Sequence, residues 1–446
     1  MLNSPDRANE NTRRLVSAPD IAICFLLAVA AALLIWHCSH LISDGLRSSQ
    51  TDNIWFESDI NRVYQNISSR SSSHYRTKVH PLFSLFALPV SYTLTKLGHL
   101  SLDDAADAFL AAVAGLWAIS IFLVVRFLRF DRGMATLAAI TGLITSSSLF
   151  FLSVPETYGL ASISILGTIL IVLATEGTKM ERLGAVAASA CSLGFTVTNW
   201  MLGLLATFLR RKSLAQWIQL SINAFFVVTV FWTVEKGLAP TAEFFTAISE
   251  ERGYLVHLSP ARFLSVGRAF LFHSIIAPAV EQTPDFGVHE HVGPAWPLAL
   301  SFQNAWPGSG SAWGIAAASI WGLILLLGVS TMIRAPGRGI LLAMLGYLVF
   351  EFILHLVYGV ETFMYALDWV PILIVIAVYG FNRLAWARWP AMIVFAVLLG
   401  VNNFQQFRSV SGLTAAYDKE HPVSHPLTRA EMRVTMCPCL AIPERH

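Results

Sequence analysis

Apolar runs long enough to cross a lipid bilayer recur along this chain. A spanning helix needs about 20 mostly apolar residues, and several uninterrupted runs approach or exceed that length. Only 13% of the 446 residues are charged, whereas a soluble protein carries about a quarter, and the mean hydropathy is +0.59. The sequence lacks the short alternating segments of a membrane β-barrel. We therefore predict an all-α, polytopic membrane protein.

The apolar runs divide the chain into about 10–12 membrane segments. Residues 1–20 form an N-terminal tail, 21–404 the membrane domain and 405–446 a short polar C-terminal tail. The first run is too long and too uniformly apolar for a cleavable signal peptide, so we interpret it as an anchor. The predicted segments are 21–42, 82–97, 106–128, 134–153, 157–175, 184–209, 217–237, 313–333, 339–358, 362–381 and 390–404.

Loop charges set the predicted topology, because cytoplasmic loops carry an excess of Lys and Arg. Arg13 and Arg14 place the N-terminus inside, so 43–81 becomes a first outer loop and 238–312 a second. An odd number of membrane crossings must separate an outer loop from an inner loop. This rule fails if segments 82–97 and 184–209 each cross the membrane once. We predict that both are re-entrant, the second with its tip near Asn199, since irregular backbone at membrane depth must line a cavity. The alternative is that the charge rule fails at one loop.

The first outer loop contains WFESDINRVYQNISSRSSSHYRTKVHP, a polar stretch between two apolar runs. Charge beside a bilayer is costly and is expected to have a function. Glu57 and Asp59 both lie on this outer face, and Asp59 is the first candidate to accept a proton from an acceptor hydroxyl. The alternative is that Asp59 only pairs with Arg62, three residues along a helix.

Basic residues follow the acids within the same stretch. Arg offers a planar fork for phosphate oxygens and Lys a mobile point charge. We predict a phosphate or pyrophosphate site, the alternative being a basic patch that touches lipid head groups. The candidate phosphate ligands are Arg62, Arg76, Lys78 and His80.

Further ionisable residues are expected near the same outer cavity. Glu156 follows Pro155 at a turn, where an acid at a helix start is also ordinary. Glu351 and His355 lie four apart in one apolar segment, and buried ionisable pairs in membranes are functional candidates. The candidate cavity-lining residues are Asn199, Glu351, His355, Glu361 and Tyr365.

Metal and nucleic-acid signals are weak. Cys437-Pro-Cys439 and His289-Glu290-His291 each lack a third spaced ligand, so we assign no metal ligand and no cofactor, although a divalent metal could take part. The net charge of +2 is too small to indicate nucleic-acid binding. Segment 261–280 has apolar residues at helical spacing with basic residues between them, which predicts a helix along the membrane surface.

The order of these elements resembles the GT-C superfamily of integral-membrane glycosyltransferases, which includes protein mannosyltransferases and the bacterial lipid A aminoarabinose transferase. The resemblance covers roughly 20–400 and includes a second large outer loop before the last helices. The motifs that carry it are Phe56-Glu57-Ser58-Asp59, Val79-His80-Pro81-Leu82-Phe83, the Arg-rich loop 126–132 and Pro155-Glu156.

This resemblance implies an inverting transfer of a hexosyl or pentosyl group from a polyprenyl-phosphate or polyprenyl-diphosphate donor. It implies that Asp59 is the general base, that Glu156 is a second catalytic acid, and that Arg76 and Lys78 bind the donor phosphate. The acidic motif is Glu-Ser-Asp rather than an adjacent pair, so Glu57 competes for the role of base. The soluble C-terminal domain of some members has no counterpart here.

Three functions are therefore open at this point. The preferred one is a glycosyltransferase acting at the outer face of the membrane on a glycan, lipid or protein acceptor. The alternative is a transporter or flippase of a lipid-linked sugar, and a structural membrane protein is a third possibility. We expect a bacterial inner membrane with the active site facing the periplasm; a lumenal site in the endoplasmic reticulum is the alternative.

Overall fold

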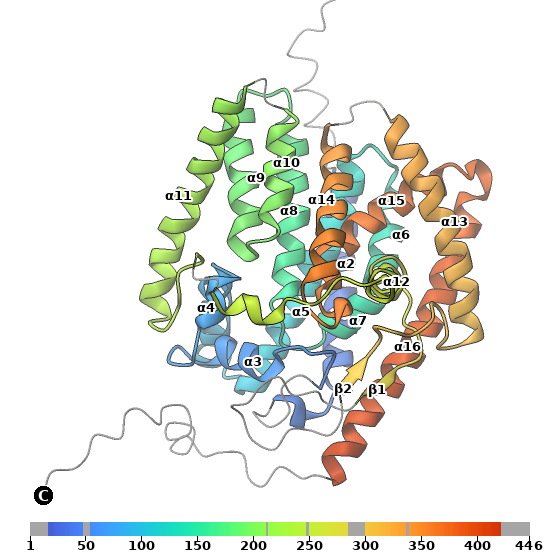
Figure 1. Ribbon diagram of the computed structural model, residues 1–446, viewed down its shortest axis with the longest axis horizontal. Coiled ribbons are helices and arrows are strands. Elements are labelled where there is room, and N and C mark those ends of the chain that lie inside the picture. Colours follow the sequence, from blue (N-terminus) through green and yellow to red (C-terminus); the bar gives the residue numbers. More distant parts are fainter. Residues whose placement is uncertain are drawn as a thin grey trace, which may run out of the picture.

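Helices lie side by side through most of the molecule, with α11 (Leu214–Leu238) at one edge and α13 (Ala312–Arg334) at the other (Figure 1). The computed structural model describes residues 17–47, 54–210, 213–246, 249–283, 299–335 and 339–420. Two short strands, β1 (Glu281–Thr283) and β2 (Ala299–Ser301), pair antiparallel. The prediction of an all-α polytopic chain is confirmed at this level.

Seven helices of the described residues are long and apolar enough to cross a membrane. An eighth span would be the bent pair η5 (Thr362–Asp368) and α15 (Val370–Asn382), whose axes differ by 67°. This measure counts spanning helices only, whereas the predicted 10–12 membrane segments also include the re-entrant segments 82–97 and 184–209. The seven are α2 (Ala18–Ser39), α5 (Leu102–Phe127), α8 (Tyr158–Thr175), α11, α13, α14 (Gly339–Val357) and α16 (Arg388–Glu420).

The predicted segment 134–153 is broken in two, into α6 (Arg132–Leu143) and α7 (Ser146–Phe151). The backbone groups freed at the break bond elsewhere in the protein. The Ser146 N–H donates to the Ile275 carbonyl at 2.8 Å, and the Asn403 amide donates to the carbonyls of Ile144 and Ile275 at 2.8 and 2.7 Å. These partners lie far away in the chain, so the local pattern did not reveal the break.

Two further segments are also short. The predicted segment 82–97 is a helix of 14 residues, α4 (Phe83–Lys96), and 184–209 is a hairpin of α9 (Glu181–Phe195) and α10 (Trp200–Phe208). The hairpin tip contacts the start of α4, because Val197 N–H donates to the Val79 carbonyl at 3.0 Å and Leu82 N–H to the Gly194 carbonyl at 2.8 Å. None of these helices is among the candidate spans, as the re-entrant interpretation expects.

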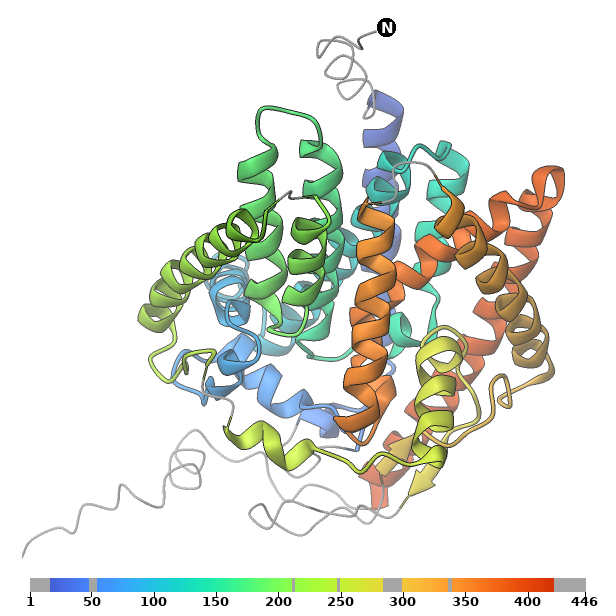
Figure 2. The same ribbon diagram turned by 45° about the horizontal axis from the view of Figure 1, so that its top comes forward.

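Different parts of the chain form the two ends of the bundle. The start of α2 and the α5–α6 connection lie at the upper end of Figure 2, where Asp20 pairs with Arg126 and Arg132. The two predicted outer loops lie together at the opposite end. Their elements are η1 (Asp44–Arg47), α3 (Ile60–Ser68), η2 (Tyr75–Lys78), η3 (Ser249–Tyr254), α12 (Pro260–Arg268), η4 (Ala269–His273), β1 and β2.

The last helix corrects a predicted boundary. The polar tail was expected from 405, but α16 continues to Glu420. Phe407 and Val410 are fully buried three residues apart, so a helical apolar stripe persists beyond the uninterrupted apolar run. The end of α16 returns to the first loop, where the Ser43 hydroxyl donates to Asp418.

Segment 261–280 also differs from its predicted surface position. Helix α12 exposes Phe263 and Leu264, as expected, but the chain then turns inward through η4. Phe270 and Ile275 are buried in the main core. Its second half is therefore part of the core rather than a helix along the surface.

Candidate active site

The acidic motif sits on an unusual turn. Phe56 and Glu57 have φ values of 53° and 59°, a left-handed conformation that costs energy for residues with a side chain. The Phe56 ring is buried against Phe302 and Phe363, with centroids 4.6 and 5.2 Å away. Leu300 N–H donates to the Ile54 carbonyl at 2.9 Å. Aromatic packing therefore holds the turn that presents Asp59 at the start of α3.

Asp59 lies where three parts of the chain meet. Its Oδ1 accepts from Arg62 Nη1 at 2.9 Å, as the helical spacing predicted. Its Oδ2 lies 3.3 Å from Arg76 Nε, and its backbone N–H donates to Glu156 Oε1 at 2.7 Å. The side chain is 18% exposed, so the carboxylate is held in place yet remains accessible.

Glu156 lies behind Asp59 and supports it. Its Oε2 accepts from the Thr157 N–H at 2.9 Å, so both oxygens bind backbone amides. Burial and the nearby Asp59 charge raise the pKa of Glu156 to about 7. Glu156 therefore contacts Asp59 through the Asp59 backbone N–H, and this contact can fix the position of Asp59.

Arg76 is a largely buried cation without a hydrogen-bond acceptor. Its side chain is 12% exposed, and its nearest acids are Asp59 and Glu251, the latter 3.8 Å from Nη1. Within the described residues, its side chain donates no hydrogen bond; the ion pair with Asp59 is not aligned for one. A guanidinium carries five N–H donors, so Arg76 has donors available for an anion.

Lys78 completes the cationic side of the site. Its Nζ is 4.0 Å from Glu251 Oε1, and the side chain is only 1% exposed. The Nζ of Lys78 and the guanidinium carbon of Arg62 each lie 4.8 Å from the centroid of the Tyr75 ring. A ring face attracts cations, so Tyr75 holds two of the four predicted phosphate ligands near Asp59.

His80 does not fit the predicted role of phosphate ligand. Its Nδ1 lies 2.9 Å from the Phe195 carbonyl and its Nε2 3.1 Å from the Thr157 hydroxyl. Burial and the nearby Arg76 charge lower the pKa of His80 to about 3. A neutral ring with both nitrogens engaged is a structural link between the hairpin tip and the turn at Glu156.

Two site residues were missed by the sequence reasoning, Glu251 and Tyr358. Glu251 Oε2 accepts from the Tyr358 hydroxyl at 2.5 Å, while Oε1 faces Arg76 and Lys78. Glu251 stands among many charges in the long second loop, and no spacing rule marks it. Only the fold brings it to the cations of the first loop.

The predicted cavity-lining residues form a second cluster, deeper among the helices. Asn199 donates to Asp368 Oδ1 at 3.1 Å and accepts from the Tyr347 hydroxyl at 2.6 Å. Glu351 and His355 pair at 3.4 Å, as their spacing predicted. Glu351 Oε1 and His355 Nδ1 are buried without a hydrogen-bond partner in the described residues, so this cluster is only partly satisfied.

Tyr365 and Glu361 lie between the two clusters. The Tyr365 ring is 4.6 Å from the ring of His355 and 6.0 Å from that of Tyr358. Glu361 is buried and accepts from the Ser301 hydroxyl at 2.5 Å. Burial is the main cause that raises its pKa, to about 8. Glu57 acts electrostatically on Glu361 and on Arg262, so it belongs to this side of the site.

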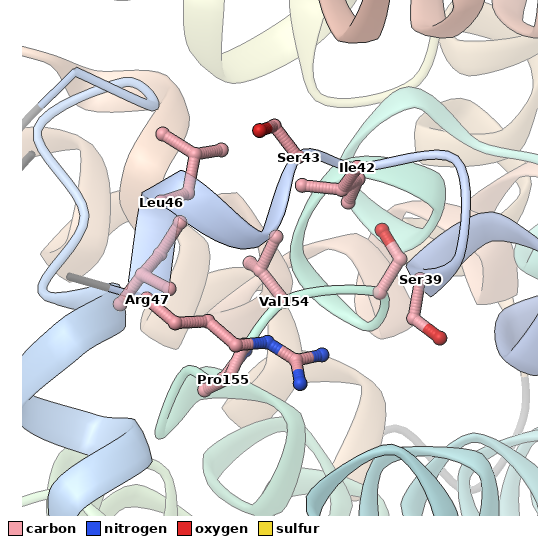
Figure 3. Close-up of a pocket in the computed structure, with 9 residues that line it drawn as sticks. Ser39, Ile42, Ser43, Leu46, Arg47, Val154 and Pro155 are labelled. Atoms are coloured by element: carbon pink, nitrogen blue, oxygen red, sulfur yellow. The ribbon is translucent and has the colours of Figure 1, made fainter. Parts of the chain in front are cut away.

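A small pocket lies beside the site, without containing any of the predicted site residues (Figure 3). Arg47, which borders it, pairs with Asp103 at 3.0 Å and Asp107 at 2.5 Å. Two carboxylates already balance this cation, so the pocket has no free charge to offer from Arg47. Its lining residues are Ser39, Ile42, Ser43, Leu46, Arg47, Ile60, Ser153, Val154 and Pro155.

The described residues contain no group of three or more His, Cys, Asp or Glu side chains that could hold a metal ion. Both weak metal motifs, His289-Glu290-His291 and Cys437-Pro-Cys439, lie outside the described residues.

Comparison with protein-family models, with curated proteins and with solved structures found no match to this chain. The resemblance to GT-C glycosyltransferases therefore rests on the motifs and their order alone.

Proposed function

We propose that this protein is an integral-membrane glycosyltransferase that moves a sugar from a polyprenyl-phosphate donor to an acceptor hydroxyl. The observation that carries the proposal is Arg76. Its buried guanidinium lies 3.3 Å from Asp59 and donates no side-chain hydrogen bond to the described residues. Phosphate oxygens are the partners that such a fork binds best. Arg76 could therefore bind the donor phosphate, while the neighbouring Asp59 carboxylate could act as the general base.

In the proposed reaction, Asp59 removes the proton from the acceptor hydroxyl. The acceptor oxygen forms a bond to the anomeric carbon of the sugar as the bond from that carbon to the phosphate oxygen breaks. The electron pair of the broken bond stays on the phosphate, which leaves as polyprenyl phosphate, and attack from the opposite face inverts the configuration. Arg76 and Lys78 stabilise the charge that develops on the phosphate.

Asp59 is the better candidate for the base than Glu57. Asp59 contacts Arg76 directly at 3.3 Å and Arg62 at 2.9 Å. A base must lie within reach of the hydroxyl that attacks the anomeric carbon from the face opposite the phosphate, and Asp59 is close to the cations that would hold that phosphate without being one of its ligands. Glu156 positions Asp59 through its backbone amide.

The proposed setting is a bacterial inner membrane with this end of the bundle in the periplasm. The basic α5–α6 connection at the opposite end supports that orientation. The acceptor would be a glycan, lipid or protein that reaches the outer face, and the polyprenyl tail would lie along the apolar helices.

Asp59→Asn tests the proposal. Protein in nanodiscs is incubated with radiolabelled polyprenyl-phosphate sugars and membrane extract, and label that leaves the carrier is counted. Loss of a general base lowers rates by about 10²–10⁴-fold. Asp103→Asn is the matched control, because Asp103 is 64% exposed and pairs with Arg47 outside the site. Transfer at wild-type rates by Asp59→Asn would refute the role of this residue.

A flippase for lipid-linked sugars is the second candidate, and the deeper polar cluster favours it. Asp368 with Asn199, and Glu351 with His355, lie buried among helices, where ionisable groups often mark transport paths. Liposomes that hold fluorescent lipid-linked sugar would separate the two functions. Label that changes leaflet while remaining on its carrier would support the flippase and argue against the transferase.

A further inference from the structure

A carboxylate of the protein lies where the proposed donor phosphate has to bind. Glu251 Oε1 is 3.8 Å from Arg76 Nη1 and 4.0 Å from Lys78 Nζ. These are the two cations assigned to the phosphate. Glu251 belongs to η3 of the second loop, whereas Asp59 precedes α3 of the first loop. A group with one negative charge thus faces both cations.

These contacts are electrostatic rather than hydrogen-bonded. Hydrogen bonds from N–H to O have lengths of about 2.7–3.2 Å, which both separations exceed. The hydrogen bond to the Glu251 carboxylate comes instead from the Tyr358 hydroxyl, at 2.5 Å. The side chain of Glu251 is 15% exposed, and its separations from the two cations are 3.8 and 4.0 Å. The Glu251 carboxylate therefore balances the charge of Arg76 and Lys78, but neither cation holds it by a short hydrogen bond.

We infer that Glu251 is an internal substitute for the donor phosphate, and that the donor displaces it on binding. This inference rests on the proposed function and adds a specificity-determining residue to it. With the site empty, Glu251 limits the cost of two largely buried cations. When a phosphate arrives, its oxygens form the hydrogen bonds that Glu251 does not make with Arg76. Ligands that bind the cations weakly fail to displace Glu251.

The test is the affinity for a probe that carries the phosphate alone. Decaprenyl phosphate is titrated into the full-length protein in nanodiscs, and binding is followed by microscale thermophoresis. Glu251→Gln removes the competing charge while keeping the shape, so its Kd is expected to fall at least about tenfold, which is 1.4 kcal/mol. Glu243→Gln is the matched control, because Glu243 is an exposed acid in the same loop. Its Kd should remain that of the wild type.

Two further measurements separate competition from a structural effect. Decaprenol, which has the same tail and no charge, should bind all variants equally. Tyr358→Phe removes the hydrogen bond that holds Glu251 in its present position and should tighten decaprenyl phosphate binding by a smaller factor, about twofold to fivefold. An unchanged or weaker affinity of both Glu251→Gln and Tyr358→Phe would overturn the inference.

Arg76→Gln distinguishes failure of this inference from failure of the proposed function. If Arg76→Gln weakens binding of decaprenyl phosphate while Glu251→Gln fails to tighten it, the phosphate site stands and Glu251 is only a structural partner. If Arg76→Gln leaves binding unchanged, the phosphate is not at this site, and the proposed function and the inference both fail.

Discussion

Two aspartates, one at each end of the bundle, are each flanked by two arginines, and they differ in how completely they are bonded. Asp20 Oδ1 accepts from Arg126 Nε at 3.1 Å and Arg132 Nε at 3.0 Å. Its Oδ2 accepts from the hydroxyl and the backbone N–H of Ser17 at 2.6 and 2.9 Å. Asp20 is 1% exposed, so this arrangement is closed and fully bonded.

Asp59 has the same ingredients in an open arrangement. Arg62 forms one hydrogen bond to it, and Arg76 approaches its second oxygen without one. The comparison teaches that a carboxylate with two arginines is not by itself a sign of catalysis. Donors and acceptors left over after internal bonding distinguish a candidate active site from a structural one.

The largest predicted effect on stability is at the closed arrangement. Asp20→Asn leaves Arg126 and Arg132 facing each other without a carboxylate, and removal of one partner from a buried ion pair costs about 3–5 kcal/mol. Asp59→Asn should cost less, because the Asp59 carboxylate itself is 18% exposed and Glu251 still faces Arg76 after the substitution. Thermal unfolding in detergent, followed by tryptophan fluorescence, measures both. Equal losses of stability would remove the distinction between the two ends.

Glu156 provides a pH-dependent test at the open end. Its pKa rises from 4.5 to about 7, so the folded protein retains a proton that the unfolded chain releases. Its contribution to stability is therefore present below pH 4.5 and is lost as pH rises to about 7, by about 3 kcal/mol for the full shift. Glu156→Gln cannot titrate and should lack this decline.

The measurement compares the unfolding temperatures of wild type and Glu156→Gln from pH 4 to pH 8. The two should converge at low pH and separate in favour of Glu156→Gln as pH rises. Parallel curves would show that the Glu156 carboxyl titrates normally, and that Asp59 is held by an ordinary ionised acid.

Helices with long apolar runs could be predicted from sequence, whereas interruptions set by distant partners could not. The hairpin of α9 and α10 was anticipated because basic residues flank it on both sides. The break between α6 and α7 was not, because Asn403 and Ile275 stabilise it from elsewhere in the chain. The extension of α16 was missed because its buried stripe is interrupted by polar residues.

In the candidate site, too, residues close together in the sequence could be predicted, whereas residues brought in by tertiary packing could not. Asp59, Arg76 and Lys78 were identified because they lie close together in one polar stretch. Glu251 and Tyr358 were missed, since only tertiary packing brings them to that stretch. His80 was assigned from its charge type, but its neutral state depends on burial, which the sequence pattern does not reveal.

Arginine-to-lysine substitutions sharpen the comparison further. Arg76→Lys keeps the charge and loses the fork, so the transfer rate at low donor concentration should fall about 10–100-fold, or about 1.4–2.8 kcal/mol. Arg132→Lys makes the matched change at the other end, where the side chain is 47% exposed, and should leave transfer unchanged. Transfer kinetics with limiting donor measure both. An Arg76→Lys protein with wild-type kinetics would show that Arg76 supplies only a point charge.

The smallest predicted effect compares two glycines with positive φ. Gly177, in the α8–α9 connection, has φ +67° and open space around it, whereas Gly359 has φ +74° and a Cβ there would lie 2.7 Å from Tyr365 Cε2. Both alanine variants bear the backbone cost of about 1–2 kcal/mol. Only Gly359→Ala must also move Tyr365, which packs near Tyr358.

Gly177→Ala should therefore lower the unfolding temperature while transfer remains unchanged, and Gly359→Ala should lower both. Transfer per folded molecule is the informative readout, because it cancels the shared loss of stability. A fall confined to Gly359→Ala would show that Tyr365 and Tyr358 must be held in place for the Asp59 site to work. Equal transfer by the two variants would mean that the tyrosines only fill space, and that the open end depends on its charged residues alone.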